Sequence, residues 1–376
     1  MQLKEIFLIN KADMFPVKFR KSKGECKLMS LSRLNKRCRL LIIMLIIMLI
    51  ILISHYRHLL HKPVELHLQK MPFVSDKNIF FIETSCIFNT KVRPGRLHLN
   101  TKQVCSIYSA AILNPTRSVI LYHSCPLLQN YYEKSSNAVK QILKLPNVYI
   151  MNTKFETLVR DFLLKNISHD LKKSKLNRKY APDILKLSLI HQFGGVFMDL
   201  NFISLRSLDS LDSNFIACES NEKFTSSIFQ LDYKDIGSEF IETMMQDLEE
   251  SYVSDKTITN LEDLITRNYF QYCNIPAVNC SKIAKGNYIG EYTSKKCGIT
   301  VYNAKTFFPI DYRQWETLID PQYAEQIWKN ISDSITLYTW KYLANDVNIV
   351  KGEFSAYELI VKKYCSEVYD SIGEEF

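Results

Sequence analysis

The stretch from residue 183 to residue 208 reads DILKLSLIHQFGGVFMDLNFISLRSL. Its first part has apolar residues at helical spacing and ends at two glycines, which predicts a helix over residues 181–192. Gly194 and Gly195 let the backbone turn sharply from that helix into a short strand over residues 196–198. A helix that leads directly into an apolar strand is typical of an α/β sheet.

Two polar residues follow the predicted strand, Asp199 and Asn201. Residues i and i+2 of a strand point to the same side, so both oxygen-bearing side chains are expected to converge on one spot. A hard divalent cation bridging a diphosphate could sit there. Asp199 and Asn201 are therefore the candidate catalytic and metal-binding residues. The alternative interpretation is a polar strand end with Asx-turn chemistry.

The rest of the chain after residue 77 alternates between strand and helix patterns. Such alternation predicts an α/β fold with a mostly parallel sheet covered by helices, whose ligands bind outside the carboxyl ends of the strands. The predicted strands cover residues 78–83, 118–122 and 147–151, and the predicted helices cover residues 103–113 and 139–143.

The positive charge of the chain is concentrated at its N-terminus. The chain has 376 residues and a formal net charge of +9, and residues 1–39 hold 11 Lys and Arg against three acids. The remainder is close to neutral, so net charge gives no argument for a nucleic-acid partner. Aromatic residues make up 12% of the chain, and it has only 10 Gly and 11 Pro, which together exclude a coiled coil or a collagen-like rod.

Residues 40–53 are drawn only from Leu, Ile and Met. We expect a transmembrane signal anchor over residues 40–56, short for a span but extended by Ser54, His55 and Tyr56. The basic tail before it places the N-terminus in the cytoplasm. The predicted organisation is a cytoplasmic tail (1–39), the anchor (40–56), a stem (57–76) and a lumenal domain (77–376). This is a type II topology in the Golgi membrane, with the endoplasmic reticulum as the alternative.

Cysteines and glycosylation sequons agree with a lumenal domain. Eight of the ten cysteines lie after the predicted anchor, an even set that suits disulfides in an oxidising compartment. Their pairing cannot be read from spacing, and buried free thiols are the alternative. Three Asn-x-Ser sequons, at Asn166, Asn279 and Asn330, favour a glycoprotein.

Several blocks in order resemble the α1,4-glycosyltransferase family of lactosylceramide α1,4-galactosyltransferase and α1,4-N-acetylglucosaminyltransferase. The blocks are FFIETSC at 80–86, QVCSIYSAA at 103–111, HQFGGVFMDLN at 191–201, CGITV at 297–301, FFPI at 307–310, SAY at 355–357 and KYC at 363–365. The resemblance spans about residues 78–372 and marks the chain as a divergent member.

The resemblance implies a nucleotide-diphospho-sugar transferase (GT-A-like) domain of a type II Golgi enzyme. It would transfer a hexose or N-acetylhexosamine from a UDP-sugar to a galactose-type hydroxyl of a glycolipid or glycoprotein, with an α1,4 bond and retention. Asp199 and Asn201 would hold Mn²⁺ and the diphosphate. The implied donor-binding residues are Glu83, Thr84, Asp183, Lys186, Gly194 and Gly195, and the acceptor-side candidates are Glu219 and Trp340.

Departures from the family pattern leave a second hypothesis open. The second aspartate of the DxD motif is Asn201, the helix arginine is Lys186, and a histidine near the C-terminus is Tyr338. Lysine keeps the charge of arginine but loses its bidentate fork. The chain is thus interpreted either as an enzyme with weakened metal use or as a catalytically weak or inactive relative. The latter would bind glycans or act as a scaffold for another Golgi transferase, and a homo- or hetero-oligomer stays open in both cases.

Overall fold

A computed structural model describes most of the chain after residue 77. The described residues are 44, 47–49, 51–52, 75, 77–88, 97–125, 132, 135–159, 162–172, 178–255, 258–284, 297–340 and 349–374. Contacts divide the chain into residues 1–63 and 64–376. Among the described residues, no helix combines the length and the apolar character that crossing a membrane requires. The predicted anchor over residues 40–56 falls largely outside these residues and stays a prediction.

The second unit is built on a seven-stranded sheet with the order β3-β2-β1-β4-β7-β6-β8. Two further strands, β5 and β9, form a small antiparallel sheet of their own. The strands are β1 (Ile79–Glu83), β2 (Val119–His123), β3 (Val148–Asn152), β4 (Gly195–Met198), β5 (Phe202–Ser204), β6 (Phe215–Ala217), β7 (Ile228–Leu231), β8 (Thr300–Tyr302) and β9 (Thr336–Tyr338).

The predicted mostly parallel sheet is confirmed. Strand β1 pairs in parallel with both β2 and β4, β2 pairs in parallel with β3, and β6 pairs in parallel with β8. Strand β7 alone runs in the opposite direction within this sheet, antiparallel to β4 and to β6. The carboxyl ends of β1, β2, β3 and β4 therefore lie along one edge.

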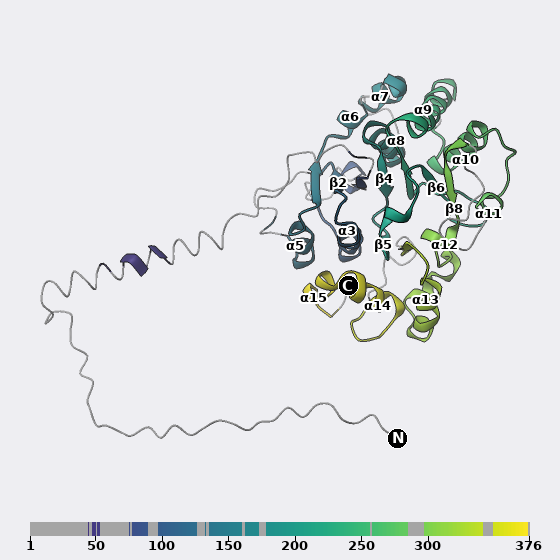
Figure 1. Cartoon of the computed structure of the whole chain (residues 1–376). Coiled ribbons are helices and arrows are strands. Elements are labelled where there is room, and N and C mark those ends of the chain that lie inside the picture. The colour runs from purple at the N-terminus through teal and green to yellow at the C-terminus, as the bar shows by residue number, and fades with distance from the viewer. Residues whose placement is uncertain are drawn as a thin grey trace, which may run out of the picture. The chain divides into compact units, whose positions relative to one another are not determined.

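Helices cover both faces of the sheet (Figure 1). Alternate side chains of β1 show how the faces divide: Ile79 and Phe81 pack with α3, α5, α14 and α15, whereas Phe80 packs with α8, α9 and α10. The longer helices are α3 (Thr101–Leu113), α7 (Lys165–Lys172), α8 (Ala181–Phe193), α9 (Asp235–Asp255), α10 (Leu261–Tyr272) and α14 (Ala356–Tyr364).

Short helices and 3-10 turns fill the connections. The short α-helices are α2 (Ser85–Phe88), α5 (Asn137–Leu143), α6 (Phe155–Leu158), α11 (Cys280–Ile283), α12 (Ala304–Phe307), α13 (Ala324–Asn330) and α15 (Ser366–Ser371). The 3-10 turns are η2 (Phe162–Leu164), η3 (Arg178–Tyr180), η4 (Leu208–Ser210), η6 (Tyr312–Leu318) and η7 (Pro321–Tyr323).

The turn from α8 into β4 depends on its two glycines. Gly194 ends α8 with φ 64°, and Gly195 begins β4 with φ 96°. A Cβ on Gly195 would lie 2.6 Å from the carbonyl oxygen of Asn78, the group that accepts the first hydrogen bond between β4 and β1. The structure thus gives both predicted donor-binding glycines a backbone role, since they bring α8 and β4 together next to β1.

The predicted disulfides are confirmed, with all eight cysteines after the predicted anchor paired. The bonds are Cys86–Cys125, Cys105–Cys365, Cys218–Cys280 and Cys273–Cys297. Two of them lie next to the carboxyl edge of the sheet: Cys86 follows β1 and its partner follows β2, while Cys218 follows β6.

Candidate functional site

Asp199 lies directly after β4, but it begins a turn and does not continue the strand. The Phe202 N–H donates to the Asp199 carbonyl at 3.2 Å, and the Asp199 N–H donates to the Ser227 carbonyl at 2.9 Å. The expectation that Asp199 and Asn201 share one side of an extended strand is therefore wrong, because the chain reverses between them. The two residues reach the same region from a turn that leads into β5.

Lys186 lies behind Asp199 and is held by α8. Its Nζ is 3.7 Å from Asp199 Oδ1 and 3.7 Å from Asp183 Oδ1. The same Nζ donates to the Ser226 carbonyl at 3.3 Å and contacts the Ser226 Oγ at 3.5 Å. The side chain of Lys186 is only 9% exposed, against 25% for each aspartate. The structure therefore brings together three residues that the sequence proposed.

A third carboxylate, that of Glu262, completes a polar cluster with Asp183, Lys186 and Asp199. Glu262 lies in the first turn of α10 and accepts a hydrogen bond from the Ser226 hydroxyl. Burial acts to lower the pKa of the Lys186 ammonium, but Asp199, Asp183 and Glu262 outweigh it and hold that pKa above its usual value. The ammonium therefore stays charged. No sequence signal marked Glu262, because only the fold brings the first turn of α10 to Ser226.

Burial raises the pKa of the Asp183 carboxyl, while Lys186 opposes the rise. Burial also raises the pKa of the Glu219 carboxyl, which follows β6, and the negative charges of Glu262 and Asp199 raise it further. These couplings place Glu219 within electrostatic reach of the cluster. The acceptor-side candidate Glu219 and the donor-side candidate Asp183 therefore belong to one electrostatic neighbourhood.

Asn201 is tied to β9. Its carbonyl accepts from both the N–H and the hydroxyl of Thr339, each at 2.9 Å, and its amide Nδ2 donates to the Tyr338 hydroxyl at 3.2 Å. Burial raises the pKa of Tyr338, and the Asp199 charge adds to the rise, so this hydroxyl stays protonated at neutral pH. From the sequence, Tyr338 was noted only as a tyrosine in place of a histidine of the family. The hydrogen bond between its hydroxyl and Asn201 was not predicted.

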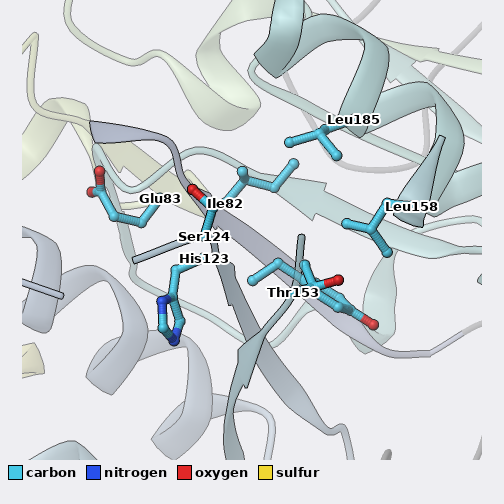
Figure 2. A pocket seen from close by; sticks show the side chains of 8 residues that line it. Ile82, Glu83, His123, Ser124, Thr153, Leu158 and Leu185 are labelled. Carbon is cyan, nitrogen blue, oxygen red and sulfur yellow. The ribbon is translucent and has the colours of Figure 1, made fainter. Parts of the chain in front are cut away.

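A small hollow lies further along the same edge, at the ends of β1, β2 and β3. Its volume is about 10 Å³, the space of a single water molecule. Figure 2 shows Ile82, Leu158 and Leu185 on one side of the strands, whereas Glu83 and His123 extend from the other. The hollow is lined by Ile82, Glu83, Tyr122, His123, Ser124, Thr153, Leu158 and Leu185.

Helix α8 joins the hollow to the polar cluster, because Leu185 lines the first and Lys186 belongs to the second. The predicted nucleotide-end residue Glu83 lies at the hollow but its carboxylate is engaged within the chain. Its two oxygens accept from the Ser85 N–H at 2.7 Å and from the Gln103 side chain at 2.6 Å. Thr84 follows it, half-buried, between β1 and α2.

His123 pairs in register with Glu83 on one side and with Asn152 on the other. It is 2% exposed, and burial lowers its pKa to about 4 despite a hydrogen bond to the Cys125 backbone. Among the described residues, its Nε2 has no hydrogen-bond partner. His123 is a neutral, buried polar group beside the hollow, and no motif in the sequence singled it out.

Trp340 is in the core, not on the surface. Its side chain is 2% exposed, its indole N–H donates to the Ile310 carbonyl at 2.9 Å, and its ring packs edge-on against Tyr338 at 4.8 Å between centroids. Trp340 is therefore corrected as an acceptor-side candidate, because burial leaves neither face of its indole open to a sugar. Trp340 instead packs against the ring of Tyr338 in the core.

The described residues hold no cluster of side chains that would bind the expected divalent cation by itself. Within the described parts of the chain, no group of three or more His, Cys, Asp or Glu side chains is arranged to hold a metal ion. Asp199 already has an ammonium partner, and Asn201 is neutral and hydrogen-bonded to Tyr338. The predicted Mn²⁺ stays a prediction from resemblance alone, and we derive no step through it.

Two family models match the chain. The region described as "Glycosyltransferase sugar-binding region containing DXD motif" matches residues 101–216, which include Asp199 and Asn201. The region described as "Alpha 1,4-glycosyltransferase conserved region" matches residues 233–372. Of the seven-stranded sheet, the first match contains β2, β3, β4 and all but the last residue of β6, and the second contains β8.

Curated relatives match over most of the chain. The alpha-1,4-N-acetylglucosaminyltransferase of Homo sapiens is 22% identical over 303 residues, 78% of this chain and 80% of the relative. The lactosylceramide 4-alpha-galactosyltransferase of Mus musculus is 20% identical over 295 residues, 77% of this chain and 74% of the relative. A solved structure of the galactosyltransferase LgtC covers 70% of this chain and 85% of its own at 10% identity, with a TM-score of 0.33.

Proposed function

We propose that the chain, which is similar to α1,4-glycosyltransferases over most of its length, transfers a sugar from a UDP-sugar donor to a glycan acceptor. In detail, a hexose or N-acetylhexosamine would pass to a galactose-type hydroxyl of a glycolipid or glycoprotein, with an α1,4 bond and retention of configuration. The observation that carries the proposal is the cluster of Asp183, Lys186 and Asp199 at the end of β4, inside the segment that matches the sugar-binding family model.

The donor would lie along the carboxyl edge of the sheet. Its uracil base would rest on the apolar side of the hollow, against Ile82, Leu158 and Leu185. Its sugar would reach the polar cluster, where the oxygens of Asp183 and Asp199 accept hydrogen bonds from sugar hydroxyls. Helix α8 spans both places, so it sets the distance between base and sugar.

The acceptor would approach from the side of β6 and β9. Glu219 lies there with a raised pKa, and Tyr338 presents a hydroxyl that stays protonated. Both groups can exchange hydrogen bonds with an acceptor hydroxyl near the anomeric carbon. We assign neither of them as a covalent nucleophile.

We further propose that the chain works as a type II protein of the Golgi membrane, with lipid contacts through its anchor. The support is the apolar run over residues 40–53 behind a basic tail, together with eight paired cysteines in the domain that follows. Disulfides persist in the secretory pathway and are rare in the cytosol.

A transfer assay tests the proposal. The full-length chain in detergent is supplied with UDP-galactose or UDP-N-acetylglucosamine and a galactose-terminated glycolipid, and release of UDP is followed together with the product. We expect transfer that falls about 100-fold or more in Asp199→Asn, since an electrostatic group at the reacting centre is lost.

The matched control is Asp333→Asn, because Asp333 is an exposed aspartate paired with Arg206 outside the cluster. Transfer that survives Asp199→Asn would contradict the proposed site. A folded chain that transfers none of the donor sugars and binds no UDP would favour the scaffold hypothesis.

A further inference from the structure

A second, larger hollow lies between η7 and α13 on one side and α14 with the loop before it on the other. We call it the C-terminal groove; Gln322, Glu325, Trp328, Lys329, Phe354 and Leu359 line it. Helix α13 packs against α14 beneath it, and its volume of about 640 Å³ is in the range of sites for small molecules. None of these residues belongs to the polar cluster or to the hollow at β1, β2 and β3.

Phe354 enters the C-terminal groove from a strained backbone. Its φ is 59°, in the left-handed region that a bulky residue rarely adopts, and its side chain is 62% exposed. Burial in the core therefore does not account for a phenylalanine at this position. Strain of this kind persists where the surroundings enforce it, and it concentrates at ligand-binding segments.

Glu358 enforces the backbone of this loop from below. Its side chain is buried, and its carboxylate accepts from the N–H groups of Gly352 and Phe354 and from the Tyr369 hydroxyl, each at 2.7 Å. Burial acts to raise the pKa of Glu358, but these hydrogen bonds outweigh it and hold that pKa below its usual value. The loop is therefore fixed by an ionised carboxylate, and Phe354 is held in place at its tip.

The opposite wall carries polar groups of both signs. Glu325 and Lys329 lie one helical turn apart on α13, and Gln322 lies beside them on η7. A carboxylate and an ammonium at this spacing compensate each other, so the wall favours neither an anion nor a cation. Together with the amide they offer both hydrogen-bond donors and acceptors.

We propose that the C-terminal groove binds a neutral oligosaccharide, with one sugar ring stacked on Phe354. A pyranose presents a face of C–H groups that packs on an aromatic ring, and its hydroxyls both donate and accept hydrogen bonds. The ring of Trp328 has the Lys363 ammonium 5.0 Å from its centroid, so Phe354 offers the more open ring. This site lies outside the proposed transfer site and is tested by sugar binding alone.

The test is saturation-transfer NMR with the full-length chain in a detergent that has no sugar headgroup. The probes are lactose, N-acetyllactosamine and the anionic 3′-sialyllactose. We expect saturation of the ring protons of the two neutral sugars, and titrations give their dissociation constants. Phe354→Ala should weaken lactose binding about fivefold, because the stacking ring is lost. UDP binding should stay unchanged in this variant.

The matched control is Val253→Ala, which truncates an apolar side chain that is 50% exposed on α9, and lactose binding should not change. Glu358→Gln keeps Phe354 but loosens its loop, and it should weaken lactose binding about twofold. Thermal unfolding establishes that each variant is folded. The Phe354→Ala comparison stands if Glu358→Gln is not, because Phe354 is largely exposed.

Four results would overturn the inference. They are absence of saturation in both neutral sugars, equal lactose binding by the wild type and Phe354→Ala, tighter binding of 3′-sialyllactose than of lactose, and loss of lactose binding in Asp199→Asn. Self-association that Phe354→Ala abolishes would assign the groove to a second copy of the chain and overturn it as well. Lactose binding of the expected kind by a chain that transfers no sugar would overturn the proposed function and leave this inference standing.

Discussion

The polar cluster at the end of β4 and the hollow at the ends of β1, β2 and β3 lie on one edge of one sheet, yet they are built from opposite chemistry. The cluster joins a buried ammonium to Asp183 and Asp199, whose side chains are one quarter exposed. The hollow is mainly apolar, and the polar groups beside it are neutral or already hydrogen-bonded, as with His123 and Glu83.

The difference teaches how one edge can serve a two-part ligand. A flat base gains from apolar contact, whereas a sugar and a diphosphate need hydrogen-bond partners and compensated charge. In this chain α8 supplies a leucine to the one region and a lysine to the other from adjacent positions, Leu185 and Lys186. Substitutions in the two regions should therefore have separable effects.

Each region has its own disulfide, and removing them should give the largest effects. Cys86–Cys125 links the segments that follow β1 and β2 beside the hollow. Cys218–Cys280 lies next to Glu219. Replacing either pair by serine should lower the free energy of unfolding by about 4 kcal/mol, because loops of these lengths gain that entropy in the unfolded chain. Denaturant unfolding measures the loss.

The two serine variants should differ in function. Loss of Cys86–Cys125 should weaken UDP binding, whereas loss of Cys218–Cys280 should change transfer to the acceptor and leave UDP binding nearly unchanged. Equal effects of both variants on UDP binding would break the division between the two regions.

The next effect concerns His123 and pH. Its pKa in the folded protein is lowered to about 4 by burial, so the unfolded chain binds the proton more readily between that value and the ordinary value near 6.5. The stability is fully present above about pH 6.5 and is lost as the pH falls through this window, by about 3 kcal/mol in total. Denaturant unfolding at pH 7, 5.5 and 4.5 measures it.

In His123→Asn that part of the pH dependence should disappear, whereas in the control His98→Asn it should remain, because His98 is exposed. Identical pH profiles for the wild type and His123→Asn would show that His123 is not the group that titrates.

A charged side chain introduced into the hollow tests whether its apolar character matters for UDP binding. Leu158→Glu should weaken UDP binding about tenfold, since a carboxylate there opposes both the apolar contact and the nearby phosphates. Leu163→Glu is the matched control, because Leu163 is also half-buried against the same core but does not line the hollow. Equal weakening by both variants would point to general destabilisation.

The smallest effect is expected at Tyr338. Tyr338→Phe removes the hydroxyl that accepts from Asn201, which should lower the rate of transfer about threefold and leave UDP binding within error. Tyr312→Phe is the control, since Tyr312 is 45% exposed. A loss of UDP binding in Tyr338→Phe would place Tyr338 on the donor side.

The sequence was most informative where local patterns and tertiary structure agree. The helix predicted over residues 181–192 is α8, and the strand predicted over residues 147–151 is β3, shifted by one residue. Asp183 and Lys186 lie one helical turn apart on α8, so their meeting is a local property. Asp199 follows within the same helix–turn–strand unit, and the structure brings the three residues together.

The remainder of the site depends on contacts between distant segments. Tyr338 meets Asn201 across a sequence separation of 137 residues, and Glu262 reaches Ser226 only because α10 packs beside α9. An aromatic residue near a proposed sugar site carries no local sign of burial, so Trp340 was placed wrongly. The alternating pattern of residues 199–202 fits a strand and a turn equally well, so the sequence left the Asx turn at Asp199 as the alternative.

The most direct test of the account is saturation-transfer NMR on UDP-galactose and UDP-N-acetylglucosamine with the full-length chain. The account predicts the strongest transfer to the uracil and ribose protons, which would lie on the methyl groups of Ile82, Leu158 and Leu185. In Leu158→Glu the uracil signals should fall, and unlabelled UDP should displace both donors. Absence of transfer to either donor, or transfer that UDP does not displace, would contradict the claim that this edge binds a UDP-sugar.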